Sequence, residues 1–298
     1  MKYRECKIQI PKKIYDEFEE FVLQLPIEGY YEILFDPENP KSHKEGIISD
    51  NTRLSVYLKE DDLHTELKIF VFLKIHSLDD FFLESKIIET KDYEESYKEF
   101  YTPFEIGRYF IIPTWEKSKN ANTPSSSIPL FLNPGMAFGT GHHETTKLML
   151  NRMSSLNFTE KSILDIGTGS GILSIGAALL GAKFVTALDI DPNSIRAAEY
   201  NWNENAIPPN VRFELYEGGF DHKMAQEKKY DFLLTNITYS VISNNIDFIS
   251  SIQTDHFLFS GVITEKRDLA IELFSKNLGG KLLYEDKLND WVIIEWSK

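Results

Sequence analysis

Residues 163–172 read ILDIGTGSGI, a mostly apolar run followed by three glycines at every second position and then by another apolar residue. The pattern predicts a strand over Ser162–Ile166, a tight turn, and a helix from Gly171 to Leu180. Glycine allows the backbone to turn and to approach a ligand where a side chain would block it. The start of a helix presents unpaired N–H groups to such a ligand. The glycines alone are equally compatible with a structural turn and with a ligand-binding loop.

An acidic residue after the next predicted strand favours the ligand-binding interpretation. Asp189 follows the strand predicted at Phe184–Leu188. A carboxylate at this place accepts hydrogen bonds from the ribose hydroxyls of a nucleoside. Asp191 directly precedes Pro192 and is typical of a helix cap. The glycine turn and Asp189 together predict a nucleoside-binding site.

Strands and helices alternate from Leu130 to the end of the sequence. Seven segments have the pattern of strands: Ser162–Ile166, Phe184–Leu188, Val211–Leu215, Asp231–Thr235, Phe257–Phe259, Lys281–Tyr284 and Val292–Glu295. Such alternation predicts an α/β fold with a mostly parallel, doubly wound sheet. The last two strands, separated by Asn289 and Asp290, are expected to form an antiparallel hairpin at one edge.

The first 88 residues mix strands and helices differently and predict a smaller α+β domain of the ferredoxin-like kind. Strands are expected at Arg4–Ile10, Tyr30–Phe35, Arg53–Leu58 and Leu67–Lys74, and helices at Lys13–Leu25 and Asp79–Ile88. We expect residues 1–88 to form a substrate-recognition domain, although a merely stabilising appendage is the alternative. Residues 89–128 are expected to be a linker with a flexible loop, and residues 129–298 a catalytic domain.

The composition limits the partners of the chain. Its 298 residues include 32 Lys and Arg against 46 Asp and Glu, a net charge of −14. Affinity for nucleic acid comes largely from basic side chains, so no direct nucleic-acid partner is expected, and a basic protein or cationic ligand suits this field better. The one cysteine, Cys6, excludes a disulfide framework. No apolar stretch approaches the ~20 residues that span a bilayer, and no signal peptide is recognisable. We expect a cytoplasmic monomer.

The position of the third glycine distinguishes between nucleoside cofactors. The dinucleotide fingerprint is GxGxxG, whereas here the third glycine is Gly171 and Ile172 stands in the fingerprint position. No lysine follows as in a P-loop. Asp165, just before the glycines, would repel a pyrophosphate. A cofactor with ribose, adenine and a positive centre but no phosphate fits these residues better, and S-adenosyl-L-methionine is such a cofactor.

A longer motif lies upstream, where residues 133–146 read NPGMAFGTGHHETT. This stretch resembles the signature of the ribosomal protein L11 methyltransferases, the PrmA family, and the glycine turn resembles motif I of class I methyltransferases. The similarity extends over residues 97–115, 171–178, 188–192, 236–237 and 260–263. The resemblance implies a class I methyltransferase (Rossmann-like) seven-stranded sheet. It also implies S-adenosylmethionine-dependent N-methylation of lysine or N-terminal amines of ribosomal protein L11.

The resemblance also implies roles for single residues. Cofactor-binding positions are implied at Thr146, Gly167, Gly169, Asp189 and Asn236, and in the loop residues Phe138, Gly139 and Thr140. Asn236 is expected to hold the acceptor amine, with Tyr239 and Phe138 shaping its approach. A lysine amine has a pKa of ~10.4, and burial near apolar groups lowers that pKa so that the nitrogen arrives deprotonated. His143 is interpreted as a polar support and not as a metal ligand, and no metal is expected. Thr145 or Thr146 is expected to cap the following helix.

Several positions depart from the family pattern and leave the acceptor open. Asn133 replaces the usual Asp, His142 and Glu144 replace Thr and Pro, and Thr238-Tyr239 follow Asn236-Ile237. One alternative is therefore the same chemistry on another protein or a small molecule. A nucleotide-dependent dehydrogenase is a second alternative, against which Ile172 argues. A non-catalytic S-adenosylmethionine-binding scaffold is a third, and the intact set of implied site residues argues against it.

Overall fold

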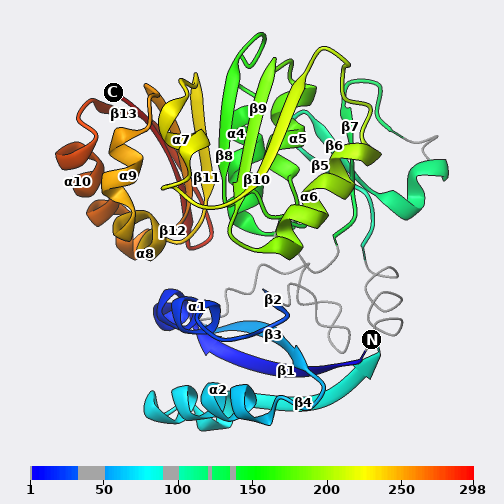
Figure 1. Ribbon diagram of the computed structural model, residues 1–298, viewed down its shortest axis with the longest axis vertical. Helices are drawn as coiled ribbons and strands as arrows, with labels where there is room; N and C mark the ends of the chain where they lie inside the picture. Colours follow the sequence, from blue (N-terminus) through cyan, green and yellow to red (C-terminus); the bar gives the residue numbers. More distant parts are fainter. Residues whose placement is uncertain (1, 33–50, 90–100, 120–122, 135–138) are drawn as a thin grey trace. The chain divides into compact units, whose positions relative to one another are not determined.

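The computed structural model describes most of the chain, namely residues 2–32, 51–89, 101–119, 123–134 and 139–298. The chain forms two compact units, Met1–Thr102 and Pro103–Lys298 (Figure 1). The boundary between them falls inside the linker expected at 89–128, of which residues 90–100 and 120–122 lie outside the described part. None of the described helices combines the length and the apolar composition needed to cross a membrane.

The N-terminal unit is a four-stranded antiparallel sheet in the order β2-β3-β1-β4, with a helix after β1 and another after β3. Its elements are β1 (Lys2–Pro11), η1 (Lys12–Ile14), α1 (Tyr15–Leu23), β2 (Gly29–Glu32), β3 (Asn51–Lys59), α2 (Leu63–Ile75), η2 (Asp79–Phe81) and β4 (Phe82–Glu89). Alternation in β1 places Cys6, Ile8 and Ile10 in the core, where all three are fully buried. This arrangement confirms the expected ferredoxin-like layer.

Two predictions for this unit are wrong. Leu67–Lys74 was expected as a strand but lies within α2, and Asp79–Ile88 was expected as a helix but contains η2 and most of β4. A short apolar run is compatible with a strand and with a buried helix. The helix forms here because the Asp62 carboxylate accepts a 3.0 Å hydrogen bond from Thr65 N at its start, and because residues at helical spacing are buried. Residues 82–89 instead pair along β1 as an edge strand.

The second unit is built on a seven-stranded sheet in the order β10-β9-β8-β11-β12-β14-β13 (Figure 1). Its strands are β8 (Ser162–Ile166), β9 (Phe184–Asp189), β10 (Arg212–Glu217), β11 (Phe232–Asn236), β12 (His256–Ile263), β13 (Lys281–Leu288) and β14 (Trp291–Ser297). All seven predicted strands are confirmed. Pairing is parallel except around β14, which runs antiparallel to both neighbours, so the predicted edge hairpin is confirmed too.

Helices cover both faces of this sheet. One face carries α4 (Glu144–Met153), α5 (Ile172–Leu179) and α6 (Pro192–Glu204). The other carries α7 (Lys223–Glu227), α8 (Tyr239–Asn244), α9 (Ile246–Ser251) and α10 (Arg267–Asn277), with η4 (Thr264–Lys266) before α10. Alternation in β8 sends Leu164 and Ile166 into the core beneath α7–α10, whereas Asp165 faces α5. The glycine turn follows β8 at the carboxyl edge of the sheet.

A small sheet precedes the large one in sequence and contacts the helices α4, α5 and α6. It consists of β5 (Phe104–Ile106), β6 (Tyr109–Pro113) and β7 (Ile128–Leu132), with η3 (Thr114–Lys119) between β6 and β7. The buried Tyr109 hydroxyl donates to the backbone oxygen of Gly176 in α5 at 3.1 Å. A Cβ on Gly176 would lie 3.2 Å from that hydroxyl, which is why a glycine stands within this helix. Residues 104–132 thus belong to the second unit by their contacts.

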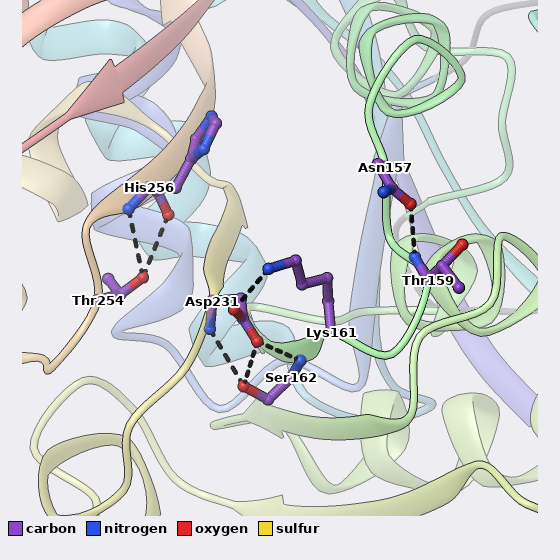
Figure 2. A network of polar contacts seen from close by, with 7 residues as sticks. All are labelled: Asn157, Thr159, Lys161, Ser162, Asp231, Thr254 and His256. Atoms are coloured by element: carbon purple, nitrogen blue, oxygen red, sulfur yellow. Dashed lines mark hydrogen bonds and ion pairs between the residues drawn. The ribbon is translucent and has the colours of Figure 1, made fainter.

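Polar contacts fix the amino ends of the strands, away from the glycine turn. The Asp231 carboxylate, just before β11, accepts hydrogen bonds from Ser162 N at 2.8 Å and Ser162 Oγ at 2.9 Å (Figure 2). Lys161 Nζ adds a 3.0 Å contact to the same carboxylate. Burial raises the pKa of Asp231, but the hydrogen bonds and Lys161 outweigh it and hold that pKa below its usual value. These contacts set the register between β8 and β11.

Candidate active site

The glycine turn after β8 takes a conformation that requires glycine. Gly167 and Gly171 have φ angles of +75° and +82°, in the left-handed region. A Cβ on Gly171 would lie 3.1 Å from the Cα of Ala198, so the glycine lets the start of α5 approach the backbone of α6. The N–H groups of Gly167 and Thr168 donate to the Leu188 oxygen at 2.9 and 3.0 Å. The turn is therefore bonded to the end of the neighbouring strand β9.

Asp189 lies at the end of β9 and is bonded to the same turn. Its Oδ2 accepts from Gly169 N at 2.8 Å and its Oδ1 from Asp191 N at 2.9 Å. Burial raises the pKa of Asp189 above its usual value, with these amides acting against the shift. A carboxylate has about four acceptor positions, more than these two amides use. The structure thus brings the predicted residues Gly167, Gly169 and Asp189 together with acceptor capacity for ribose hydroxyls.

Asp165 is fully buried behind the turn. Its Oδ2 accepts hydrogen bonds from Thr168 Oγ1 at 2.7 Å and from Ser174 Oγ at 2.6 Å. Its Oδ1 has no hydrogen-bond partner within the described part of the chain. Burial raises the pKa of Asp165 to about 6, against the effect of the two hydroxyls, and the nearby Asp189 raises it further. Two carboxyl groups beside one turn favour a ligand with a positive centre.

Asn236 ends β11 and meets the first turn of α4. Its Nδ2 donates to Thr146 Oγ1 at 3.4 Å, and Thr146 is fully buried. Its Oδ1 is buried without a hydrogen-bond partner among the residues that the structure describes. An acceptor oxygen in that state costs free energy unless a ligand donates to it. The structure thus brings Thr146 and Asn236 together, as the resemblance implied, and leaves one amide oxygen to receive a donor.

The backbone after Asn236 rests on β12. Gly261 has φ +84° at an irregularity of β12, and a Cβ there would lie 2.3 Å from the Ile237 oxygen. The Ile237 N–H donates to the Ser260 oxygen at 3.2 Å. On its other side, Ile237 Cγ2 would lie 2.6 Å from a Cβ on Gly167. These close approaches hold the segment that carries Asn236 between β12 and the glycine turn.

The signature segment, residues 133–146, lies partly outside the described residues, since these do not include 135–138. The predicted site residue Phe138 is among the omitted ones. Gly139 is buried, and its oxygen accepts a 2.7 Å hydrogen bond from Ser170 Oγ. Thr140 is half-buried. Gly139 is thus bonded to the glycine turn, whereas the roles of Thr140 and Phe138 stay predictions.

The start of α4 is capped by His143. Its Nδ1 accepts from Thr145 N at 3.2 Å and lies 2.7 Å from Thr145 Oγ1. The expected cap at Thr145 or Thr146 is therefore wrong, because the helix begins at Glu144 and both threonines lie in its first turn. His143 is confirmed as a polar support. Across the described ranges, no three His, Cys, Asp or Glu side chains gather as a metal site would require.

The positions that depart from the family pattern have partners in the second unit. The His142 ring stacks on Phe104 with centroids 4.0 Å apart. Glu144 Oε1 accepts from Asn289 Nδ2 at 2.7 Å, which connects α4 with the turn of the β13–β14 hairpin. Lys266 Nζ lies 5.6 Å from the ring centre of Tyr239, at the start of α8. The role of Tyr239 toward an acceptor stays a prediction.

Sequence reasoning missed Ile190, which directly follows Asp189. Its side chain is 69% exposed although it is large and apolar. A Cβ on Gly219, in the segment after β10, would lie 3.6 Å from Ile190 Cγ2, and Gly218 N donates to the Asp189 oxygen at 2.8 Å. Ile190 is thus an exposed apolar side chain directly after the largely buried Asp189. Its signal in the sequence was an isoleucine between two aspartates before Pro192.

Comparisons with known proteins agree with this geometry. The family model described as "Ribosomal protein L11 methyltransferase (PrmA)" matches residues 5–298. A protein of Leptospira interrogans serogroup Icterohaemorrhagiae serovar copenhageni, named ribosomal protein L11 methyltransferase, is 52% identical over 299 residues, covering 100% of this chain and 99% of that protein. A protein of the same name from Staphylococcus carnosus is 32% identical over 254 residues, covering 83% of this chain and 79% of that protein.

A solved structure is similar as well. The ribosomal protein L11 methylase of Lactobacillus delbrueckii subsp. bulgaricus matches with a TM-score of 0.58 at 26% identity, covering 66% of this chain and 99% of that chain. This similarity and the observed strand order confirm the expected α/β fold of the class I methyltransferase (Rossmann-like) type.

Proposed function

The chain belongs to the ribosomal protein L11 methyltransferase family, and from this premise we propose that it methylates lysine or N-terminal amines of ribosomal protein L11 with S-adenosyl-L-methionine as cofactor. When bound, that cofactor supplies a methyl group carried on a positively charged sulfur. The proposal extends to a monomer acting in the cytoplasm without direct contact to nucleic acid or membrane. In this view the N-terminal unit recognises the substrate protein.

The residues after β8 and β9 fit such a cofactor. Asp189 would hold the ribose hydroxyls, and Ile190 would contact the adenine ring. Gly167 and Gly169 have φ angles of +75° and +54°, which glycine adopts readily, and their lack of a side chain permits a ligand to approach the backbone. The carboxyl of Asp165 is compatible with a cationic ligand and not with a phosphate. All of these residues lie in the second unit.

The observation that best supports methylation of an amine is the state of the Oδ1 atom of Asn236. It is buried and lacks a partner within the described residues, while Nδ2 is bonded to Thr146. A neutral amine can donate an N–H to this oxygen and keep its lone pair for methyl transfer. A lysine amine with its ordinary pKa of ~10.4 is mostly charged at neutral pH, and the buried surroundings lower that pKa. The chain's contribution is thus orientation of the amine and exclusion of water.

Transfer of labelled methyl groups tests the proposal. Purified enzyme, labelled S-adenosylmethionine and purified ribosomal protein L11 are combined, and incorporation is followed by intact mass of the substrate protein. We expect mass gains corresponding to whole methyl groups, together with release of S-adenosylhomocysteine. A mixture of other ribosomal proteins serves as the control for specificity. Labelling of those proteins with none in L11 would contradict the proposed substrate.

A further inference from the structure

A buried asparagine in α6 connects two stretches that are distant in the sequence. Asn201 is fully buried, and its Oδ1 accepts a 2.7 Å hydrogen bond from Asn133 N. Its Nδ2 donates to the Ser170 oxygen at 2.8 Å and lies 3.5 Å from the Asn133 oxygen. One side-chain amide thus bonds the start of the signature segment and the glycine turn at the same time.

The same two stretches are connected a second time. Ser170 Oγ donates to the Gly139 oxygen at 2.7 Å, and Ser170 itself is buried. The signature segment is therefore bonded at residue 133 through Asn201 and at residue 139 directly. Asparagine has a low helix propensity, so helix formation does not explain why Asn201 stands inside α6. The two backbone segments that it joins supply that reason.

We propose that Asn201 is a positioning residue for cofactor binding, which holds Asn133, at the start of the signature segment, and the glycine turn in one mutual arrangement. The inference rests on the proposed function, in which both stretches contribute to the cofactor site. Asn201 acts through Asn133 and Ser170 rather than on the ligand itself. Its removal takes this side-chain partner from the part-buried Asn133 N–H and from the buried Ser170 oxygen. The protein then also populates arrangements in which the two stretches are not positioned to bind the cofactor. The apparent affinity for the cofactor falls in proportion to the fraction of protein that can still bind it.

Asn205 at the end of α6 provides a matched control. Its Oδ1 accepts from Phe131 N at 2.9 Å. Its Nδ2 donates at 2.7 Å to the Phe131 oxygen and also to the backbone oxygen of Asn201. Asn205 thus bonds backbone of β7 in the same manner, one helical turn from Asn201. Alanine at either position removes side-chain bonds to backbone and is expected to lower the unfolding temperature. Of the two changes, the one at Asn201 removes a side-chain bond to the glycine turn itself.

Cofactor affinity of the folded protein separates positioning from stabilisation. Sinefungin, an S-adenosylmethionine analogue, is titrated calorimetrically into full-length wild type, Asn201→Ala and Asn205→Ala, at a temperature where circular dichroism shows all three folded. We expect about tenfold weaker binding for Asn201→Ala and at most about twofold for Asn205→Ala. Wild-type affinity of Asn201→Ala, or an equal loss in both variants, would overturn the role of Asn201.

If Asn201→Ala does not fold, a less disruptive variant tests the same proposal. Ser170→Ala removes only the hydroxyl bonded to Gly139 and is expected to weaken sinefungin several-fold with little change in unfolding temperature. Unchanged affinity in Ser170→Ala would show that the mutual arrangement of the two stretches does not matter for binding. Wild-type protein is the reference for both. Absence of sinefungin binding by the wild type would overturn the proposed function together with this inference.

Discussion

Among single residues, Asn236 has an amide whose N–H group is hydrogen-bonded and whose oxygen has no partner among the described residues. Thr146 receives its N–H group, which fixes the orientation of the amide plane. The oxygen is buried without a partner in the described part of the structure. Such a group is costly for stability, and a ligand that donates to it would offset that cost.

The first prediction concerns this oxygen. Asn236→Ala removes the acceptor for the substrate amine, and we expect kcat for L11 methylation to fall by about 100-fold, because misplacement of a reacting group costs that much. Sinefungin affinity, measured separately by calorimetry, should change only a few-fold. Turnover at the wild-type rate would rule out an amine-holding role for Asn236.

The second prediction uses the buried carboxyl of Asp165. Its pKa rises from an ordinary 3.8 to about 6 on folding, so the folded state binds more protons than the unfolded state between these values. The contribution of Asp165 to stability therefore falls as pH rises from about 4 to 6 and is constant above. Asp165→Asn removes this effect, and its unfolding free energy relative to wild type should increase by about 2–3 kcal/mol between pH 4 and pH 7. Urea titrations at the two pH values measure the difference in unfolding free energy between the variant and the wild type. The same difference at both pH values would contradict a raised pKa of Asp165.

At the scale of elements, close backbone approaches hold the site segments in place. The segment after Asn236 lies against β12 at Gly261, where a Cβ would be 2.3 Å from the Ile237 oxygen. The glycine turn lies against α6 at Gly171. These contacts explain why one glycine stands at the irregularity within β12 and another at the start of α5.

The third prediction compares two glycines with left-handed φ angles. Gly261→Ala must displace the backbone that carries Asn236, so we expect more than about 3 kcal/mol of destabilisation, together with loss of methylation. Gly279→Ala is the control, since its φ is +67° but no atom lies within 4 Å of its Cβ. There only the backbone strain of about 1 kcal/mol applies. Equal effects in denaturant unfolding would show that the close approach at Gly261 is unimportant.

The elements of the second unit were predictable because their patterns are strong. Apolar strands bounded by glycine, and Asp191-Pro192 at the start of α6, have few alternative structures; the Asp191 carboxylate indeed accepts from Asn193 N at 2.9 Å. The N-terminal unit contains Leu67–Lys74, whose apolar run fits a strand as well as α2. Local pattern did not decide that case, whereas packing of Ile69 and Leu73 into the core did.

At the scale of the whole molecule, the two units have separate cores and separate expected tasks. The fourth prediction follows: a chain limited to residues 103–298 should bind sinefungin with nearly wild-type affinity but methylate ribosomal protein L11 poorly. The reason is that all described residues of the proposed cofactor site lie in the second unit. Calorimetry and the labelling assay, run on the same preparation, measure the two properties. Full methylation by the shortened chain would contradict a recognition role for the N-terminal unit.

The site was predictable only in part. Asp189, the glycines and Asn236 follow strand ends, so their meeting at one edge follows from a parallel sheet. The connection of Asn201 to Asn133 and Ser170 was not predictable, because it depends on how α6 rotates against segments 31 and 68 residues away in sequence. Ile190 was missed because its exposure is visible only in the folded structure.

We propose that S-adenosylmethionine binds at the carboxyl edge of β8, β9 and β11 and that Asp189 accepts hydrogen bonds from its ribose. The most direct measurement is calorimetric titration of sinefungin into wild type and Asp189→Ala. We expect one site per chain in the wild type and affinity at least about tenfold weaker in the variant, since a charged hydrogen-bond acceptor for the ribose is lost. No binding by the wild type at millimolar sinefungin would rule out a cofactor site at this edge of the sheet. Equal affinity in the variant would rule out the role of Asp189.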